Sequence, residues 1–291
     1  VNSGTTGTVT SSATTITGTY TNVNTALTSN ASTATNSIEG LDAVNVVLDD
    51  PDTTGTQKFA VANVRTIIGK TTGKVTATIN EGAVDTLKNA TTGVVGTTGN
   101  NLTITVTDAE ITAAELKALD AATDVKITLD PAGNNPVSVT SSAYSDVLTA
   151  FQSSGFTGLS TAPVVISGNI SVAEANAIDA LTSGAITATI SDSSFSSLNN
   201  LTGTGNAYTV VVGDVTVDAA DVNALVAKTT VKPNVNDVTT FTGSLAALNT
   251  LYVTNESKVT NTSVDEAVTV SDSSIDAALL DAINGKTSGD I

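Results

Sequence analysis

Cysteine, histidine, methionine and tryptophan are absent from this chain of 291 residues. Without cysteine and histidine, the chain can form no disulfide, no thiolate or imidazole metal site and no nucleophilic centre that depends on either residue. Arginine occurs once, at Arg65. These absences argue against an enzyme, including a polysaccharide lyase built on parallel β-coils, and they leave the redox environment undefined.

Aromatic residues are also scarce, at 3% of the chain against 40% hydrophobic residues in all. Any core must therefore be built from Val, Ile, Leu and Ala, which suits thin and regular layers. The mean hydropathy of +0.18 and the regular spacing of apolar residues argue against a disordered chain. No apolar run approaches the length of a membrane span, and no export signal opens the sequence. We expect a processed product or part of a longer protein.

Positive charge is scarce as well. The chain has 11 Lys and Arg against 28 Asp and Glu, a net charge of -17. Such a surface repels phosphate backbones and anionic lipids, so the charge argues against nucleic-acid binding and against insertion into or docking on a membrane.

What the chain does contain is an internal repeat. Five segments align without gaps, and each has apolar residues at its first, sixth and ninth positions and Thr at its thirteenth. The segments begin at Phe59, Ile111, Ile170, Val217 and Ile275 and read "FAVANVRTIIGKTTG", "ITAAELKALDAATDV", "ISVAEANAIDALTSG", "VDAADVNALVAKTTV" and "IDAALLDAINGKTSG". The threonines are Thr71, Thr123, Thr182, Thr229 and Thr287.

Each segment reads as a short helix with an encoded start. In three copies an N-cap residue is followed three positions later by an acid, the spacing of a capping box or its acidic variant: Thr112 with Glu115, Ser171 with Glu174, and Asp218 with Asp221. We expect helices of about ten residues, ended by the Gly of the "TTG" or "TSG" phrase. The side chains expected to face the interior are Leu116, Leu119, Ile178, Leu225, Leu280 and Ile283.

Runs rich in β-branched residues flank these helices. "LTITVT", "APVVIS", "YTVVVG" and "AVTVSD" precede four of them, and "GKVTATI", "DVKITL" and "GAITATI" follow three. Further helical phrases, such as "SSAYSDVLTAF" and "SSFSSLNNL", come next, so each repeat reads as two strand-plus-helix coils. Copies begin 47 to 59 residues apart, and coils of about 27 residues are of leucine-rich-repeat size, although the Asn or Cys ladder of that family is missing.

The fold class predicted is therefore an α/β repeat, an elongated β-solenoid of strand plus short-helix coils with leucine-rich-repeat-like architecture. The alternative is a set of all-β domains of surface-layer type. "TTGTV" at residues 5–9 and "TSGDI" at residues 287–291 stand at the same phase, so we expect residues 1–291 to be one continuous array cut from a longer protein. The repeat cores lie near 59–75, 111–127, 170–186, 217–231 and 275–291, with irregular insertions at 49–58 and 130–137.

Two stretches, "AVTVSDSSIDAALLDAINGKTSG" and "VTTFTGSLAALNT", give the chain a family resemblance. It resembles the tandem repeats of very large surface proteins of marine picocyanobacteria, including those linked to swimming, and repeats in related phage proteins. The likeness extends over most of the chain from "NSGTTGTVTSSATTITGTYTNVNTAL" onward. The resemblance implies an extracellular, structural or adhesive role without a defined active site.

Candidate chemistry is confined to one acidic turn. Asp49, Asp50 and Asp52 could supply oxygen ligands to Ca²⁺, whereas Pro51 and Gly55 also make the stretch a good solvated turn. No EF-hand loop is present, and we assign no catalytic or cofactor-binding residue.

Two further surface features have two interpretations each. Thr103, Thr105 and Thr107 alternate as in the threonine ladders of ice-binding solenoids, or as ordinary strand residues on a solvated face. Four tyrosines offer rings for stacking on surface glycans, or they plug the edges of coils: Tyr20, Tyr144, Tyr208 and Tyr252.

The leading hypothesis is a non-enzymatic structural or adhesive segment of a large extracellular assembly, such as a cell-surface filament, a surface layer or a giant surface protein. Its expected partners are copies of itself or adjacent repeats of the same chain. The alternative is a virion fibre or tail protein for host attachment.

Overall fold

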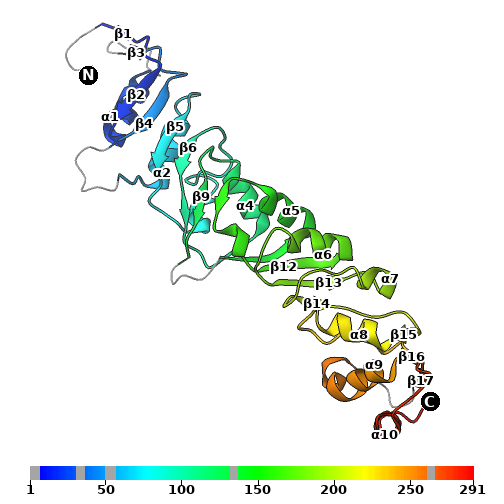
Figure 1. The fold of residues 1–291 in the computed structure, drawn as a ribbon. Helices are drawn as coiled ribbons and strands as arrows, with labels where there is room; N and C mark the ends of the chain where they lie inside the picture. Colours follow the sequence, from blue (N-terminus) through cyan, green and yellow to red (C-terminus); the bar gives the residue numbers. More distant parts are fainter. Residues whose placement is uncertain (1–6, 31–36, 50–56, 132–136, 261–265) are drawn as a thin grey trace. The chain divides into compact units, whose positions relative to one another are not determined.

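The computed structural model describes residues 7–30, 37–49, 57–131, 137–260 and 266–291. The fold is mixed α/β with several parallel sheets (Figure 1). The chain divides into two compact units, Val1–Val139 with Gln152–Ser160, and Thr140–Phe151 with Thr161–Ile291. The alternative of all-β domains is wrong, because α-helices follow the strands in both units. The continuous array of residues 1–291 stays a prediction.

In the first unit, parallel strands pair with strands later in the chain. The sheets are β1–β3, β2–β4–β5–β6 and β7–β9–β11, and β8 pairs with the start of β10. Paired residues are 20 positions apart in the case of Phe59 with Ile79 and 30 in the case of Thr15 with Asn45. The strands are β1 (Val9–Thr10), β2 (Thr15–Gly18), β3 (Ile38–Glu39), β4 (Asn45–Leu48), β5 (Val75–Thr78), β6 (Asn101–Thr103), β7 (Thr105–Val106), β8 (Glu110–Ile111), β9 (Ile127–Leu129), β10 (Ser138–Ala143) and β11 (Phe156–Thr157). The helices are α1 (Tyr20–Asn30), α2 (Val61–Ile68), α3 (Val84–Leu87) and α4 (Ala113–Asp120).

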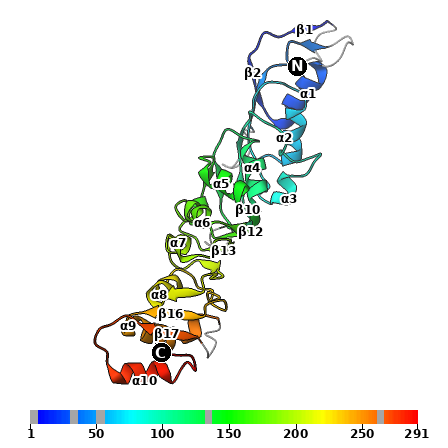
Figure 2. The ribbon, with the colours of Figure 1, turned by 90° about the vertical axis from the view of Figure 1, so that its right-hand side faces the viewer.

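The second unit follows the same plan. Its strands form the parallel arrays β12–β13–β14 and β15–β16–β17, with paired residues 20 positions apart (Thr187 with Ala207) to 27 apart (Thr240 with Ala267). Helices α6 and α7 lie on the same side of β12 and β13 in both views (Figure 1, Figure 2). The strands are β12 (Val164–Ile170), β13 (Ile186–Ile190), β14 (Ala207–Thr209), β15 (Thr216–Asp218), β16 (Thr240–Gly243) and β17 (Ala267–Val270). The helices are α5 (Tyr144–Gln152), α6 (Val172–Asp179), α7 (Phe195–Leu198), α8 (Ala219–Val226), α9 (Leu245–Asn249), η3 (Thr250–Thr254), η4 (Glu256–Lys258) and α10 (Ala277–Asn284). The short helix η2 (Leu159–Thr161) has its first two residues in the first unit.

The five aligned segments form equivalent helices: α2, α4, α6, α8 and α10. Each has eight residues and begins two positions after the first aligned residue. The predicted length of ten was slightly too long. The helical phrases after the second strand are confirmed by α5 and α7, and the β-rich runs by strands such as β5, β13 and β17. The local pattern therefore located both element types.

The cores of both units are aliphatic, as the composition requires. Leu116, Leu119, Ile178, Leu225 and Ile283 are buried, as predicted. Leu280 is not, because its side chain is only partly covered. Apolar residues on the strands alternate with polar ones: Leu102, Ile104 and Val106 are fully buried, while Thr103 and Thr107 are exposed. These threonines therefore lie on a solvated face.

The glycine of the "TTG" and "TSG" phrases does not end the helices. α2 ends at Ile68 and α6 at Asp179, several residues before Gly73 and Gly184. A Cβ at Gly73 would collide with the carbonyl of Val44, and one at Gly184 with the backbone of Ala162. Only glycine allows the chain to approach the backbone just before an earlier strand so closely. The prediction that these glycines stop the helices was wrong. Glycine is required at these positions because the backbone of another part of the chain lies against it.

The aligned residues Leu116 and Leu280 test this core directly. Leu116→Ala should lower the free energy of unfolding by about 2 to 5 kcal/mol, because it leaves a cavity in a closed core. Leu280→Ala should cost clearly less, since part of that side chain already contacts water. Urea unfolding of the two variants at low protein concentration measures the difference. Equal losses would contradict the burial described here.

Candidate functional site: contacts between strand–helix segments

The thirteenth position of each aligned segment is a threonine, and its side chain joins two parts of the chain. The Thr182 hydroxyl donates to the carbonyl of Ala162 at 2.8 Å and accepts the amide of Gly184 at 2.9 Å. The other four hydroxyls donate in the same way: Thr71 to Val44 (2.6 Å), Thr123 to Leu102 (2.8 Å), Thr229 to Tyr208 (2.8 Å) and Thr287 to Glu266 (2.7 Å). We call this bond the threonine bridge. It connects the turn after each helix to the chain at, or just before, a strand that precedes that helix.

A hydroxyl suits this position because it donates and accepts at once. Thr182 is only 7% exposed, so the carbonyl and the amide that it satisfies have little access to water. Thr123 and Thr229 each accept a further strand amide, that of Leu102 at 2.8 Å and that of Tyr208 at 2.9 Å. Sequence reasoning recognised the threonine but assigned it no role.

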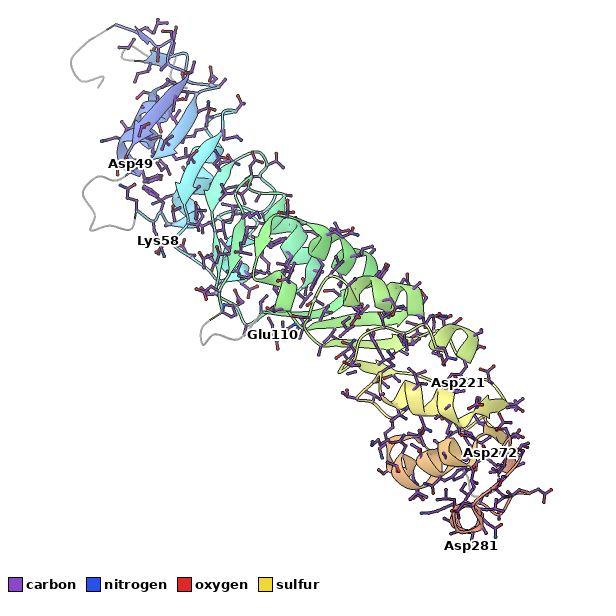
Figure 3. The ribbon with its side chains drawn as sticks, viewed as in Figure 1. Asp49, Lys58, Glu110, Asp221, Asp272 and Asp281 are labelled. Atoms are coloured by element: carbon purple, nitrogen blue, oxygen red, sulfur yellow. The ribbon has the colours of Figure 1, made fainter. Side chains whose placement is uncertain are left out.

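Acidic side chains make a second contact, at the opposite end of the helices. The first amide of α6, on Val172, donates to Oδ2 of Asp192 at 2.7 Å, and Asp192 belongs to the following segment. The same bond recurs four times: Val61 to Glu81 (2.8 Å), Val84 to Asp108 (2.8 Å), Phe195 to Asp214 (2.7 Å) and Leu245 to Asp272 (2.6 Å). Asp272 is labelled in Figure 3. A carboxylate is favoured there, because the first amides of a helix lack partners within the helix and carry partial positive charge.

The predicted N-cap residues are confirmed in all three copies, and the complete capping box is confirmed in two. Thr112 with Glu115 and Ser171 with Glu174 form complete capping boxes. Asp218 instead caps the amide of Ala220 without a reciprocal bond from Asp221. Glu115 and Glu174 therefore cap their own helices, whereas Asp221 accepts a hydrogen bond from the side chain of Asn199 at 3.0 Å.

Glu115 also binds outside its own helix. Lys88 Nζ lies 2.7 Å from Glu115 Oε1 and 2.8 Å from Asp85 Oδ1. Burial alone would raise the pKa of Glu115, but hydrogen bonds from Lys88 and Thr112 outweigh burial and lower it. The hydrogen bonds to Asp85 and Glu115 raise the pKa of Lys88. The charged forms of this cluster are thus stabilised by one another.

Two buried asparagines provide a third contact. The side-chain oxygen of Asn100 accepts the amide of Val75 at 3.1 Å, and that of Asn206 accepts the amide of Ile186 at 2.8 Å. Both side chains are buried. These are two separate contacts and not the continuous asparagine ladder of leucine-rich repeats. The available signal was a Gly-Asn pair directly before a strand, Gly99 with Asn100 and Gly205 with Asn206.

Two of the four tyrosines are buried and cannot stack on surface glycans. Tyr208 and Tyr252 are buried, and Tyr252 packs edge-on against Phe241 with ring centroids 5.8 Å apart. Burial raises the pKa of both phenols, with smaller contributions from Asp179 and Glu266 respectively. Tyr20 and Tyr144 are partly exposed. Stacking on sugars is therefore open only to these two.

A shallow groove of about 360 Å³ lies between α6 and α7. Two of its polar side chains, those of Asp192 and Asn176, already bind backbone groups. Asp192 holds the amide of Val172, and Asn176 donates to Asn200 and accepts from Thr202. The groove therefore fits packing of neighbouring helices better than reaction chemistry.

The acidic turn proposed for Ca²⁺ is described only at Asp49, whose amide donates to the carbonyl of Gly18 at 3.0 Å. Asp50 and Asp52 lie outside the described residues, so a calcium site there stays a prediction. Elsewhere in the described part of the chain, no three acidic side chains gather in a way that could hold a metal ion. In the same residues, no helix is long and apolar enough to cross a membrane.

Comparison with known proteins places the chain in no family. The sequence matches no family model and no curated protein, and the fold matches no solved structure. The three recurring contacts are therefore the basis for a functional proposal.

Removal of the threonine bridge should lower the stability of the fold measurably. Thr182→Val keeps the shape of the side chain but leaves the Ala162 carbonyl and the Gly184 amide without this partner, so it should lower the free energy of unfolding by about 1 to 3 kcal/mol. The matched control is Thr187→Val on β13, whose side chain is exposed and should tolerate the change. Thermal or urea unfolding measures both. A neutral Thr182→Val would show that the bridge contributes nothing to stability.

Proposed function

We propose that this chain is a non-enzymatic structural or adhesive repeat segment of a large extracellular assembly, and that its strand–helix segments stack into one elongated β-solenoid. The observation that carries the proposal is the recurrence of the threonine bridge at all five aligned positions. A fold in which every segment bonds mainly to its neighbours in sequence grows along one axis.

The direction of the contacts supports the same proposal. The threonine bridge reaches back to the preceding strand, and the acid at the helix start is supplied by the following segment. The parallel register supports a coil of 20 to 30 residues, since Phe59 pairs with Ile79 and Thr15 with Asn45. Each segment is thus completed by one segment on either side.

The use of the polar side chains favours a structural role over catalysis. The acids and amides at the segment boundaries hold backbone groups, as Asp192 and Asn206 do. The outward strand faces are rich in hydroxyls, such as Thr187 and Thr189 on β13. An acidic, hydroxyl-rich and aromatic-poor surface is suited to remaining soluble in salt water, and its expected partners are adjacent repeats or copies of the same chain.

Small-angle X-ray scattering tests the solenoid. A compact protein of this length has a radius of gyration of about 19 Å. We expect a clearly larger value and a rod-like intermediate region in data extrapolated to zero concentration. Scattering of a single compact particle, or of two globules, would contradict the stacking.

Surface labelling tests the extracellular role. Antibodies raised against residues 1–291 should bind intact, unpermeabilised cells of the source organism, and mild external proteolysis should remove the signal. The control is an antibody against an internal protein, which should bind only after permeabilisation. Labelling that requires permeabilisation would overturn the proposed location.

A further inference from the structure

A second set of threonines points away from the core of the first unit. They lie on β2, β5, β6, β7, β9 and β11, next to strand residues such as Leu102 and Ile127 that are fully buried. Because successive residues of a strand point to opposite faces, these threonines point outward. We call them the threonine face: Thr15, Thr17, Thr76, Thr78, Thr103, Thr105, Thr128 and Thr157.

The hydroxyls of the threonine face are available, unlike those of the threonine bridges. Thr123 is buried and donates to the carbonyl of Leu102. Within the described residues, only Thr157 of the threonine face has a side-chain hydrogen bond, a long one to the carbonyl of Ile127 at 3.4 Å. The fold thus fixes the positions of these hydroxyls and leaves them open to a ligand.

Parallel pairing arranges the hydroxyls in rows. Thr105 pairs with Thr128 and Thr128 with Thr157, so one row crosses three strands. Thr78 pairs with Thr103, which lies two residues before Thr105. Neighbouring strands are about 4.8 Å apart, and every second residue of a parallel strand lies about 6.6 Å further along it. The threonine face is therefore a lattice of hydroxyl and methyl groups in two dimensions.

Charge is excluded from these strands. Charged residues make up 13% of the chain, but the strands of the sheets β2–β4–β5–β6 and β7–β9–β11 contain none. Charged residues such as Lys74 and Lys126 flank the strands instead. Ions and charged polymers would find no charge partner on such a face. The outward positions also carry no aromatic ring on which a sugar could stack.

We propose that the threonine face of the first unit binds the surface of ice. Ice is an uncharged lattice that offers hydrogen-bond donors and acceptors, and a threonine hydroxyl can both donate and accept. The two spacings of the face are close to the repeats of the oxygen atoms on a prism face of ice, so several hydroxyls can take lattice positions together. This activity goes beyond the proposed structural role and does not depend on it.

The apolar part of the face fits the same ligand. Val47 is half-buried on β4 and stands in one row between Thr17 and Thr76. Together with the threonine methyl groups, its side chain supplies apolar surface beside the hydroxyls. Contact with an ice lattice removes this apolar surface from liquid water without leaving a charge desolvated.

Partition into ice tests the proposal. The chain of residues 1–291 is held in dilute buffer around slowly growing ice, and its amounts in the ice and in the liquid are compared. The unmodified chain should be enriched in the ice. Thr103→Lys and Thr128→Lys each place a long charged side chain in the lattice, so each variant should stay in the liquid. The matched control is Thr66→Lys at an exposed position of α2, which should enter the ice like the unmodified chain.

Far-UV circular dichroism and thermal melts establish that each variant folds, with Thr76→Lys on β5 as a further variant of the face. Exclusion of the unmodified chain from the ice overturns the proposal and makes this an ordinary solvated strand face. Folded strand variants that still enter the ice, or an equal loss in Thr66→Lys, overturn it too. Self-association that the strand variants abolish, without enrichment in ice, would assign the face to a second copy of the chain, and sedimentation velocity detects this outcome.

Discussion

The structure depends on satisfying backbone groups at the boundary between one strand–helix segment and the next. Helices of eight residues are too short to be stable alone, and with few aromatic residues each segment contributes only a thin layer of aliphatic side chains. Side chains from neighbouring segments solve this problem. Thr182 donates to the carbonyl of Ala162, just before β12, and Asp192 accepts the first amide of α6 from the following segment. Loss of one neighbour therefore removes both apolar cover and hydrogen-bond partners.

This constraint explains the composition better than solubility alone. Asp192, Asp214 and Asp272 each accept the first amide of a helix in the preceding segment. Part of the acidity is thus a structural requirement, because a carboxylate complements the partial positive charge at the helix start. Threonine is abundant for two distinct reasons. At Thr182 it forms a buried two-way hydrogen bond, whereas at Thr187 it favours an extended backbone on a solvated face.

The sequence predicted those features that depend on nearby residues. The five helices begin at equivalent positions because apolar spacing and caps such as Ser171 with Glu174 act within one or two turns. Features that depend on distant residues were missed. Gly184 looked like a helix stop, but its small size is needed against Ala162, about twenty residues earlier. Asn206 was assigned no role from the sequence, but its side-chain oxygen accepts the amide of Ile186. Leu280 fitted the apolar pattern, yet a pattern along one segment does not show whether a neighbour covers it.

The same reasoning bears on what kind of work the molecule can do. Catalysis requires polar groups that are positioned by the fold but left available for a substrate. In the groove between α6 and α7, the positioned groups are already used, since Asp192 and Asn176 bind other parts of the chain. At the segment boundaries, too, the positioned polar groups hold the backbone of a neighbouring segment, as Thr182 and Asn206 do. The polar groups that this fold positions most closely therefore serve the packing of one strand–helix segment on the next.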